Sequence, residues 1–258
     1  MRKLRHCIAI IAFGMLSASA SAQFTHVINI PPDPVPKSGR IGGVVGETTQ
    51  LNLFDTGVLP SGFLVAFGGE LNVNGGTVGD NMLIDHGGVV TINDGSIGDL
   101  VLPLPGSQLT VNGGTFAGLI QADNATLNIT GGNFLSPLLV AKNGTVVNIS
   151  GGNMGGELVP NTLSIESGSM ANLFVTDATL SDGTPLDLEF GVTTVLDHRG
   201  ILLEGHFADG SPFVFDLDAN FDGNDYFPLG SLTVTLVPTP ASVPLLGIGS
   251  LAMLRRRR

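Results

Sequence analysis

The chain has 258 residues, of which 22 are Asp or Glu and 11 are Lys or Arg. Seven of the basic residues stand within the first five and last four positions, so the interior has four basic residues against 22 acidic ones, a formal charge of −18. A protein that binds duplex nucleic acid needs clustered Lys and Arg to displace counterions from phosphates. We therefore expect no nucleic-acid partner, whereas the acidity favours cations. With 37 glycines and an apolar fraction of 43%, many short ordered segments around a substantial core are expected.

The first 22 residues have the pattern of a secretory signal peptide. Basic residues at positions 2, 3 and 5 precede an apolar run, 7–16, and a tract of Ser and Ala follows it. The run is about half as long as the roughly 20 residues of a membrane-spanning helix, which disfavours a retained anchor. We expect export and cleavage after Ala22. The cleavage point is defined by Ala20, Ala22 and Gln23. The only cysteine, Cys7, leaves with the signal peptide, so neither a disulfide nor a thiolate metal site is expected in the mature chain.

A repeat occupies residues 51–183, and residues 23–50 before it are expected to form an extended leader because prolines recur over 31–36. Aligned on their glycines, the repeat units begin at Leu71, Val90, Leu109, Leu127, Val147, Leu163 and Ala178. In every unit the third residue is apolar and the sixth is glycine. Residues 51–53 look like a further unit that lacks the glycine.

These units predict an all-β fold. Apolar residues at alternate positions, such as Leu71 and Val73, indicate a strand with one buried face, and the glycines that follow allow a sharp corner. One unit cannot bury its own apolar face, but units stacked at about 4.8 Å form a continuous core. We predict a right-handed parallel β-helix, or β-solenoid, of about seven to eight coils. The alternative is an antiparallel sandwich of short hairpins, which does not explain why equivalent columns recur at every second corner. The solenoid also predicts a polar ladder made of Asn74, Asn93, Asn112, Thr130 and Ser150.

Residues 184–236 lose the repeat and are expected to form a β-rich cap. Alternation over 201–207 and 213–217 predicts antiparallel strands joined by residues 208–211. Within the cap, oxygen-bearing side chains precede a glycine as in the first half of a calcium loop. These residues are Asp216, Asp218, Asn220, Asp222 and Asp225. Leu229 stands where an EF-hand needs its bidentate acid, so a Ca²⁺-stabilised turn and a plain solvated turn both remain open, and no other cofactor is expected.

A catalytic alternative is a β-helix polysaccharide lyase or glycosidase. Asp80 and Asp99 occupy equivalent positions of adjacent units and would lie about 5 Å apart, which suits a retaining pair. The following units have no acid there, the basic candidates are Lys142 and Arg199, and residues 71–183 offer no aromatic platform for sugars. We therefore expect a non-catalytic structural or adhesive protein, with an adhesin for extracellular polysaccharide as a variant.

The last 22 residues, 237–258, combine a proline-rich box, 12 mostly apolar residues and four arginines. The apolar span is short for a bilayer, and the arginines supply a positive-inside stop. This ending resembles the PEP-CTERM sorting tail of bacterial surface and extracellular-matrix proteins, with Thr239 where that tail has Glu. The resemblance implies processing by an exosortase-type system after export, transient membrane contact through the tail, and a location at the cell surface or outside the cell. The tail residues are Val237, Pro238, Thr239, Pro240, Arg255, Arg256, Arg257 and Arg258. The Gly- and Asn-rich phrases of residues 51–183 likewise resemble repeats of large surface proteins of environmental bacteria.

Overall fold

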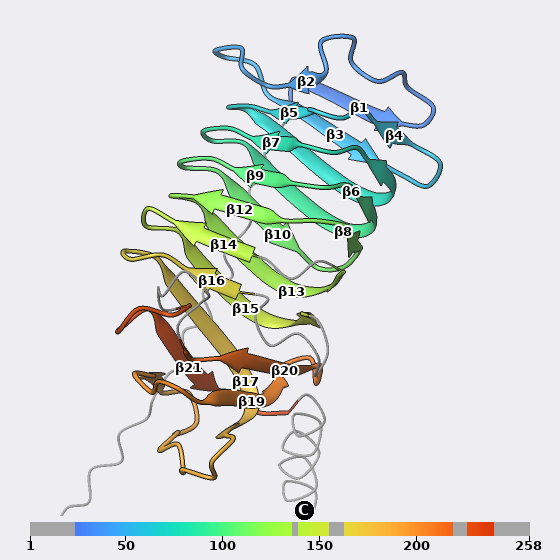
Figure 1. Ribbon diagram of the computed structural model, residues 1–258. Helices are drawn as coiled ribbons and strands as arrows, with labels where there is room; N and C mark the ends of the chain where they lie inside the picture. Colours follow the sequence, from blue (N-terminus) through green and yellow to red (C-terminus); the bar gives the residue numbers. More distant parts are fainter. Residues whose placement is uncertain (1–23, 136–138, 155–162, 219–225, 240–258) are drawn as a thin grey trace, which may run out of the picture.

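Figure 1 shows the computed structural model, which describes residues 24–135, 139–154, 163–218 and 226–239. All regular secondary structure in these residues is β-strand. Two sheets run along the molecule and face each other, and the chain passes from one sheet to the other in stacked coils. Successive coils pair in parallel, which confirms the predicted β-solenoid and excludes the antiparallel sandwich.

The small sheet contributes one strand to each of seven coils. In spatial order its strands are β2 (Arg40–Ile41), β5 (Leu64–Val65), β7 (Met82–Ile84), β9 (Val101–Pro103), β12 (Ile120–Asp123), β14 (Leu139–Lys142) and β16 (Leu163–Ile165). The large sheet follows the order β1 (His26–Ile30), β3 (Thr49–Leu53), β6 (Gly69–Val78), β8 (Val89–Ile97), β10 (Gln108–Val111), β13 (Thr126–Phe134), β15 (Val146–Asn153), β17 (Met170–Leu180), β19 (Leu202–Phe207) and β20 (Pro212–Asp216). Alongside this path lie β4 (Val58–Leu59), β11 (Thr115–Phe116), β18 (Thr193–Val195) and β21 (Leu232–Leu236).

The coils bend at a corner of the large sheet where the repeat places glycine. The glycines at the bend, Gly76, Gly95, Gly114, Gly132 and Gly152, have positive φ between 74° and 107°. Residues with a Cβ rarely adopt this conformation. The residue before the bend is also constrained, because a Cβ on Gly131 would collide with the carbonyl oxygen of Asn112 in the preceding coil. Glycine therefore lets the backbone both turn and approach its neighbour.

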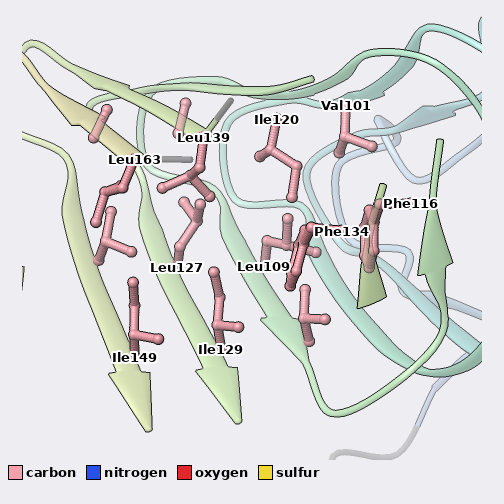
Figure 2. Close-up of a cluster of buried hydrophobic side chains, with 14 of the residues drawn as sticks. Val101, Leu109, Phe116, Ile120, Leu127, Ile129, Phe134, Leu139, Ile149 and Leu163 are labelled. Atoms are coloured by element: carbon pink, nitrogen blue, oxygen red, sulfur yellow. The ribbon is translucent and has the colours of Figure 1, made fainter. Parts of the chain in front are cut away.

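Inward-facing side chains of both sheets form one continuous core. The third residues of the first five units, Val73, Ile92, Val111, Ile129 and Ile149, are at most 1% exposed and lie in register. Figure 2 shows Leu109 and Leu127 of the large sheet facing Ile120 and Leu139 of the small sheet. Beyond the corner, Phe116 and Phe134 stack with their ring centroids 4.9 Å apart. Each such side chain contributes roughly 1.5–3 kcal/mol of transfer free energy when buried.

The repeat alignment was wrong for its sixth and seventh units. Leu163 lies in β16 of the small sheet, where it pairs with Leu139. The large-sheet partner of Val147 is instead Ala171 of β17. Ala178, at the start of the expected seventh unit, pairs with Gly205 in an antiparallel ladder. The cause is that strands of both sheets share one alternation of apolar and polar residues, so the pattern does not reveal which sheet a strand joins.

The expectation of an extended leader was also wrong for the residues described. Two strands, β1 and β2, occupy this segment and pair in parallel with β3 and β5, so it forms the first coil. β1 is an edge strand, and Asp33 covers part of its edge: the Asn29 N–H donates to Asp33 Oδ2 at 2.8 Å, and the Asp33 N–H donates to the Asn29 carbonyl at 2.8 Å. The prolines begin just after Ile30, where β1 ends, and therefore build the turn that protects the edge.

The other end of the solenoid is closed by the cap. β19 and β20 form the expected antiparallel hairpin, and β19 pairs antiparallel with β17. β21 pairs in parallel with residues 171–175 of β17, and β18 pairs antiparallel with the other edge of β21. The hairpin turn docks on the last glycine corner, because the Gly152 N–H donates to Asp209 Oδ2 at 3.0 Å and the Asp209 N–H donates to the Ser150 carbonyl at 3.1 Å.

Candidate functional surface

A column of amide and hydroxyl side chains runs along the outer surface of the large sheet. Its members occupy paired positions in successive coils. They are Asn29, Asn52, Asn72, Thr91, Thr110, Asn128, Asn148, Asn172 and Thr233, which we call the outer column. These residues lie between inward-facing core residues in their strands, so the alternation that buries the core places them on the outer side of the sheet. Thr233, in the cap, is nevertheless buried, with 5% of its surface exposed.

Hydrogen bonds link the outer column in two runs. In the first, the amide nitrogen of Asn52 donates to Asn29 Oδ1 at 2.9 Å, and that of Asn72 donates to Asn52 Oδ1 at 3.1 Å. In the second, Asn148 donates to Asn128 and Asn172 donates to Asn148, both at 2.8 Å, and the Thr233 hydroxyl donates to Asn172 Oδ1 at 2.8 Å. The second run therefore ties the solenoid to a strand of the cap.

A second ladder lies beside the glycine corner, as the sequence predicted. The amide of Asn93 donates to Asn74 Oδ1 and that of Asn112 donates to Asn93 Oδ1, each at 2.8 Å. The Thr130 hydroxyl donates to Asn112 Oδ1 at 2.8 Å. No side-chain hydrogen bond joins the described residues Thr130 and Ser150, so the bonded ladder ends at Thr130, one coil before its expected end. We call Asn74, Asn93, Asn112 and Thr130 the corner column, and the two columns together the amide face.

The amide face is uncharged although the interior of the chain is strongly acidic. The nearest acids are engaged with polar partners. Glu70 accepts hydrogen bonds from Gln50 at 2.8 Å and from Asn72 at 3.0 Å. Asp94, at the corner, accepts the N–H of Gly95 at 2.7 Å. The face therefore presents neutral donors and acceptors, bordered by carboxylates.

The outer surface of the small sheet has a different composition. Its paired positions carry Leu64, Leu83, Leu102, Gln121, Val140 and Ser164, which we call the leucine column. All six are half-buried. This surface offers mostly aliphatic groups where the amide face offers hydrogen-bonding groups.

The acid pair of the catalytic alternative is bound into the corners between coils. The Asp99 N–H donates to Asp80 Oδ1 at 2.8 Å, and the Asp80 N–H donates to Ser61 Oγ at 3.2 Å. In the following coil, a Cβ on Gly118 would fall against the Asp99 carboxylate. The two acids do stand in adjacent coils as expected, and the carboxylate of Asp80 supports the backbone of its neighbour.

The expected calcium loop lies only partly within the described residues. Asp216 ends β20, and its Oδ1 accepts the N–H of Asp218 at 3.0 Å, an Asx-type turn. Asn220, Asp222 and Asp225 lie outside the described residues, so the Ca²⁺ site stays a prediction. Across the described ranges, His, Cys, Asp and Glu residues form no group of three or more that could hold a metal ion.

The predicted address signals lie largely outside the described residues. This applies to the cleavage residues Ala20, Ala22 and Gln23 and to the tail residues Pro240, Arg255, Arg256, Arg257 and Arg258. Val237 is described: it continues from β21, and its N–H donates to the Val175 carbonyl at 2.8 Å. Pro238 and Thr239 line a hollow of about 310 Å³ with Thr176 and Phe190. Within the described part of the chain, no helix has the length and hydrophobicity to cross a membrane.

Sequence reasoning found the corner column but missed the outer column. A signal was available, because the second residue of the first five units is Asn72, Thr91, Thr110, Asn128 or Asn148. Its extension to Asn29, Asn172 and Thr233 was hidden, since the first lies in the expected leader and the last in the cap.

Comparisons with known proteins give no indication of function, so the function is inferred from the geometry of these surfaces. No family model, no curated protein and no solved structure matches the chain.

Proposed function

We propose that this protein is an exported, non-catalytic component of the cell surface or extracellular matrix, with a structural or adhesive role. The observation that carries the proposal is that polar side chains are used to join one coil to the next. Asn and Thr side chains bond along both columns, and the carboxylate of Asp80 caps the backbone of the next coil. Polar groups arranged in this way stiffen the rod.

The strand edges at both ends of the rod are at least partly covered, as expected for a structural unit of fixed length. Asp33 occupies part of the free edge of β1, and the hairpin of β19 and β20 closes the opposite end. Covered edges oppose end-to-end growth through strand pairing. The sides of the rod then remain as the surfaces that can meet other molecules, and their repeated groups favour attachment through many weak contacts.

The signal peptide and the sorting tail supply the destination in this proposal. The test is fractionation of a bacterium that has an exosortase-type system and produces the full chain. We expect the chain in the surface or matrix fraction, shortened at both ends. Replacing Arg255, Arg256, Arg257 and Arg258 with Gln should leave it unprocessed at the tail. Normal processing of this variant would contradict the sorting role, and retention of the intact chain in the cytoplasm would contradict export.

The catalytic alternative is tested separately on the purified chain. Incubation with neutral and acidic polysaccharides should release no reducing ends and no unsaturated products. Release of either that is abolished by Asp80→Asn, with the fold retained, would overturn the non-catalytic proposal.

A further inference from the structure

The amide face has hydrogen-bonding capacity that the ladders do not use. An Asn side chain has two N–H donors and about two acceptor positions on its oxygen, whereas a ladder uses one of each. Asn74, Asn93, Asn112 and Thr130 are exposed, so the remaining donors and acceptors meet solvent. Because coils stack at about 4.8 Å, these groups recur at regular intervals along the rod.

The charge distribution restricts what this face can bind. The columns themselves are neutral, whereas four acids border the face: Glu70, Asp94, Asp55 and, at the Gly152 corner, Asp209. The interior of the chain is strongly acidic. An acidic polymer would be repelled by this field, and a cationic ligand would find no carboxylate on the columns themselves. An uncharged polar ligand avoids both the repulsion and the cost of desolvating a charge.

Phenylalanine rings lie beyond both ends of the corner column, one coil before Asn74 and two coils after Thr130. Phe54 follows Leu53, whose partner is Val73 next to Asn74, and its side chain is 41% exposed. Phe174 follows Leu173, whose partner is Ile149, and it is half-buried on the outer side of β17. Apolar rings beside amides provide both halves of what a sugar needs, since a pyranose has an apolar face and a hydroxyl-bearing edge.

We propose that the amide face binds a neutral, hydroxyl-rich polysaccharide, with the glycan chain lying along the corner column from Phe54 toward Phe174. Sugar hydroxyls exchange hydrogen bonds with Asn74, Asn93 and Asn112, and the rings of Phe54 and Phe174 pack against apolar sugar faces. This inference rests on the proposed adhesive function and names its partner. Recognition is non-covalent, and no bond in the glycan breaks.

The experiment is native gel electrophoresis of the purified full chain in gels that contain hydroxyethyl cellulose, a neutral glycan, or alginate, an acidic one. We expect retardation by hydroxyethyl cellulose and none by alginate. Asn93→Asp puts a charge into the corner column and should raise the apparent Kd about tenfold, which corresponds to 1.4 kcal/mol. Gln121→Glu makes the same chemical change on the leucine column and should leave retardation unchanged.

Phe54→Ala keeps the inference testable if Asn93→Asp disturbs the ladder. Its side chain takes no part in the ladder, so the variant should fold and still lose retardation. Equal retardation by alginate, equal loss in Gln121→Glu, or no retardation by hydroxyethyl cellulose would overturn the inference. A dimer in the plain gel that Asn93→Asp dissociates and Gln121→Glu does not would assign the face to a second copy of the chain and would overturn it too. A chain that reaches the cell surface without being retarded contradicts the inference alone, whereas a retarded chain that stays in the cytoplasm contradicts the proposed function.

Discussion

The amide face and the leucine column are two outer surfaces of one solenoid, built from the same alternation of inward and outward residues. Asn and Thr dominate the first and are joined by hydrogen bonds of 2.8–3.1 Å, whereas Leu64, Leu83 and Leu102 lead the second. Folding requires only that inward positions be apolar. The difference between the surfaces therefore reports what each does outside the core: the amide face joins coils through directed bonds, and the leucine column covers its sheet with aliphatic groups.

The largest expected effect tests whether the two sheets share one core and differ only in their outward-facing residues. Ile92 of the large sheet and Ile84 of the small sheet both point inward and are fully buried. Ile92→Ala and Ile84→Ala should each lower the free energy of unfolding by about 2–5 kcal/mol, because each leaves a cavity in one shared core. Urea unfolding measures the loss. Leu83→Ala, on the outer side of β7, is the control and should cost less than Ile84→Ala; an equal cost would mean that the leucine column is buried under another part of the chain.

A smaller effect is expected for the ladder itself. Asn148 donates to Asn128 and accepts from Asn172, both at 2.8 Å. Asn148→Ala removes both bonds and should lower the free energy of unfolding by about 1–3 kcal/mol. Gln121→Ala, at a half-buried position of the leucine column, should change the free energy of unfolding by no more than about 0.5 kcal/mol. If both variants unfold at the same urea concentration, the hydrogen bonds of the amide face add nothing to stability and the contrast between the surfaces is only chemical.

The contact between the cap and the last corner should have a local effect. Asp209 accepts the Gly152 N–H at 3.0 Å and the Ser211 N–H at 2.8 Å. Asp209→Ala should lower the free energy of unfolding by about 1 kcal/mol, because the Gly152 N–H loses its hydrogen-bond partner. Hydrogen exchange should show faster exchange at Gly152 and in β15, with little change in β6. Asp187→Ala, at an exposed acid elsewhere in the cap, serves as control. Uniform acceleration along the whole solenoid would contradict a local role.

The smallest effect concerns pH. The Thr184 N–H donates to Asp182 Oδ1 at 2.7 Å, and this hydrogen bond, with a contribution from the Thr184 side chain, lowers the pKa of Asp182 below its ordinary value of 3.8. A carboxyl whose pKa is lower in the folded state stabilises the fold above pH 3.8 and loses that contribution as the pH falls toward the folded-state pKa. The melting temperature of the wild type should therefore fall slightly more than that of Asp182→Asn below pH 3.8. A larger fall in the variant would contradict the assignment.

Much of the solenoid could be predicted because its physics is local. Alternation from Leu71 to Val73 defines a buried strand face, and a glycine such as Gly95, with φ of 107°, defines the bend. Each unit carries both signals, so repetition alone implied stacking. The corner column followed as far as Thr130, because residues at one place in each unit must meet in adjacent coils.

Other features needed the three-dimensional arrangement. Leu163-Ser-Ile and Leu71-Asn-Val share one pattern, yet they belong to different sheets, because the large-sheet partner of Val147 lies 24 residues on, at Ala171, whereas that of Leu71 lies 19 residues on, at Val90. The prolines after Ile30 suggested a leader, although the strand before them opens the solenoid. In both cases the local pattern is compatible with two partners, and packing selects one.

The sequence by itself therefore determined the strand faces, the corners and the solenoid class, since alternation and backbone conformation depend on neighbours within a few residues. Only the tertiary structure decided where the first coil begins, which strand follows Val147, and how Asn172 and Thr233 extend the outer column into the cap. These outcomes depend on contacts between residues far apart in the chain. Their pairing follows from which arrangement buries the apolar face and satisfies the backbone groups at each end of the rod.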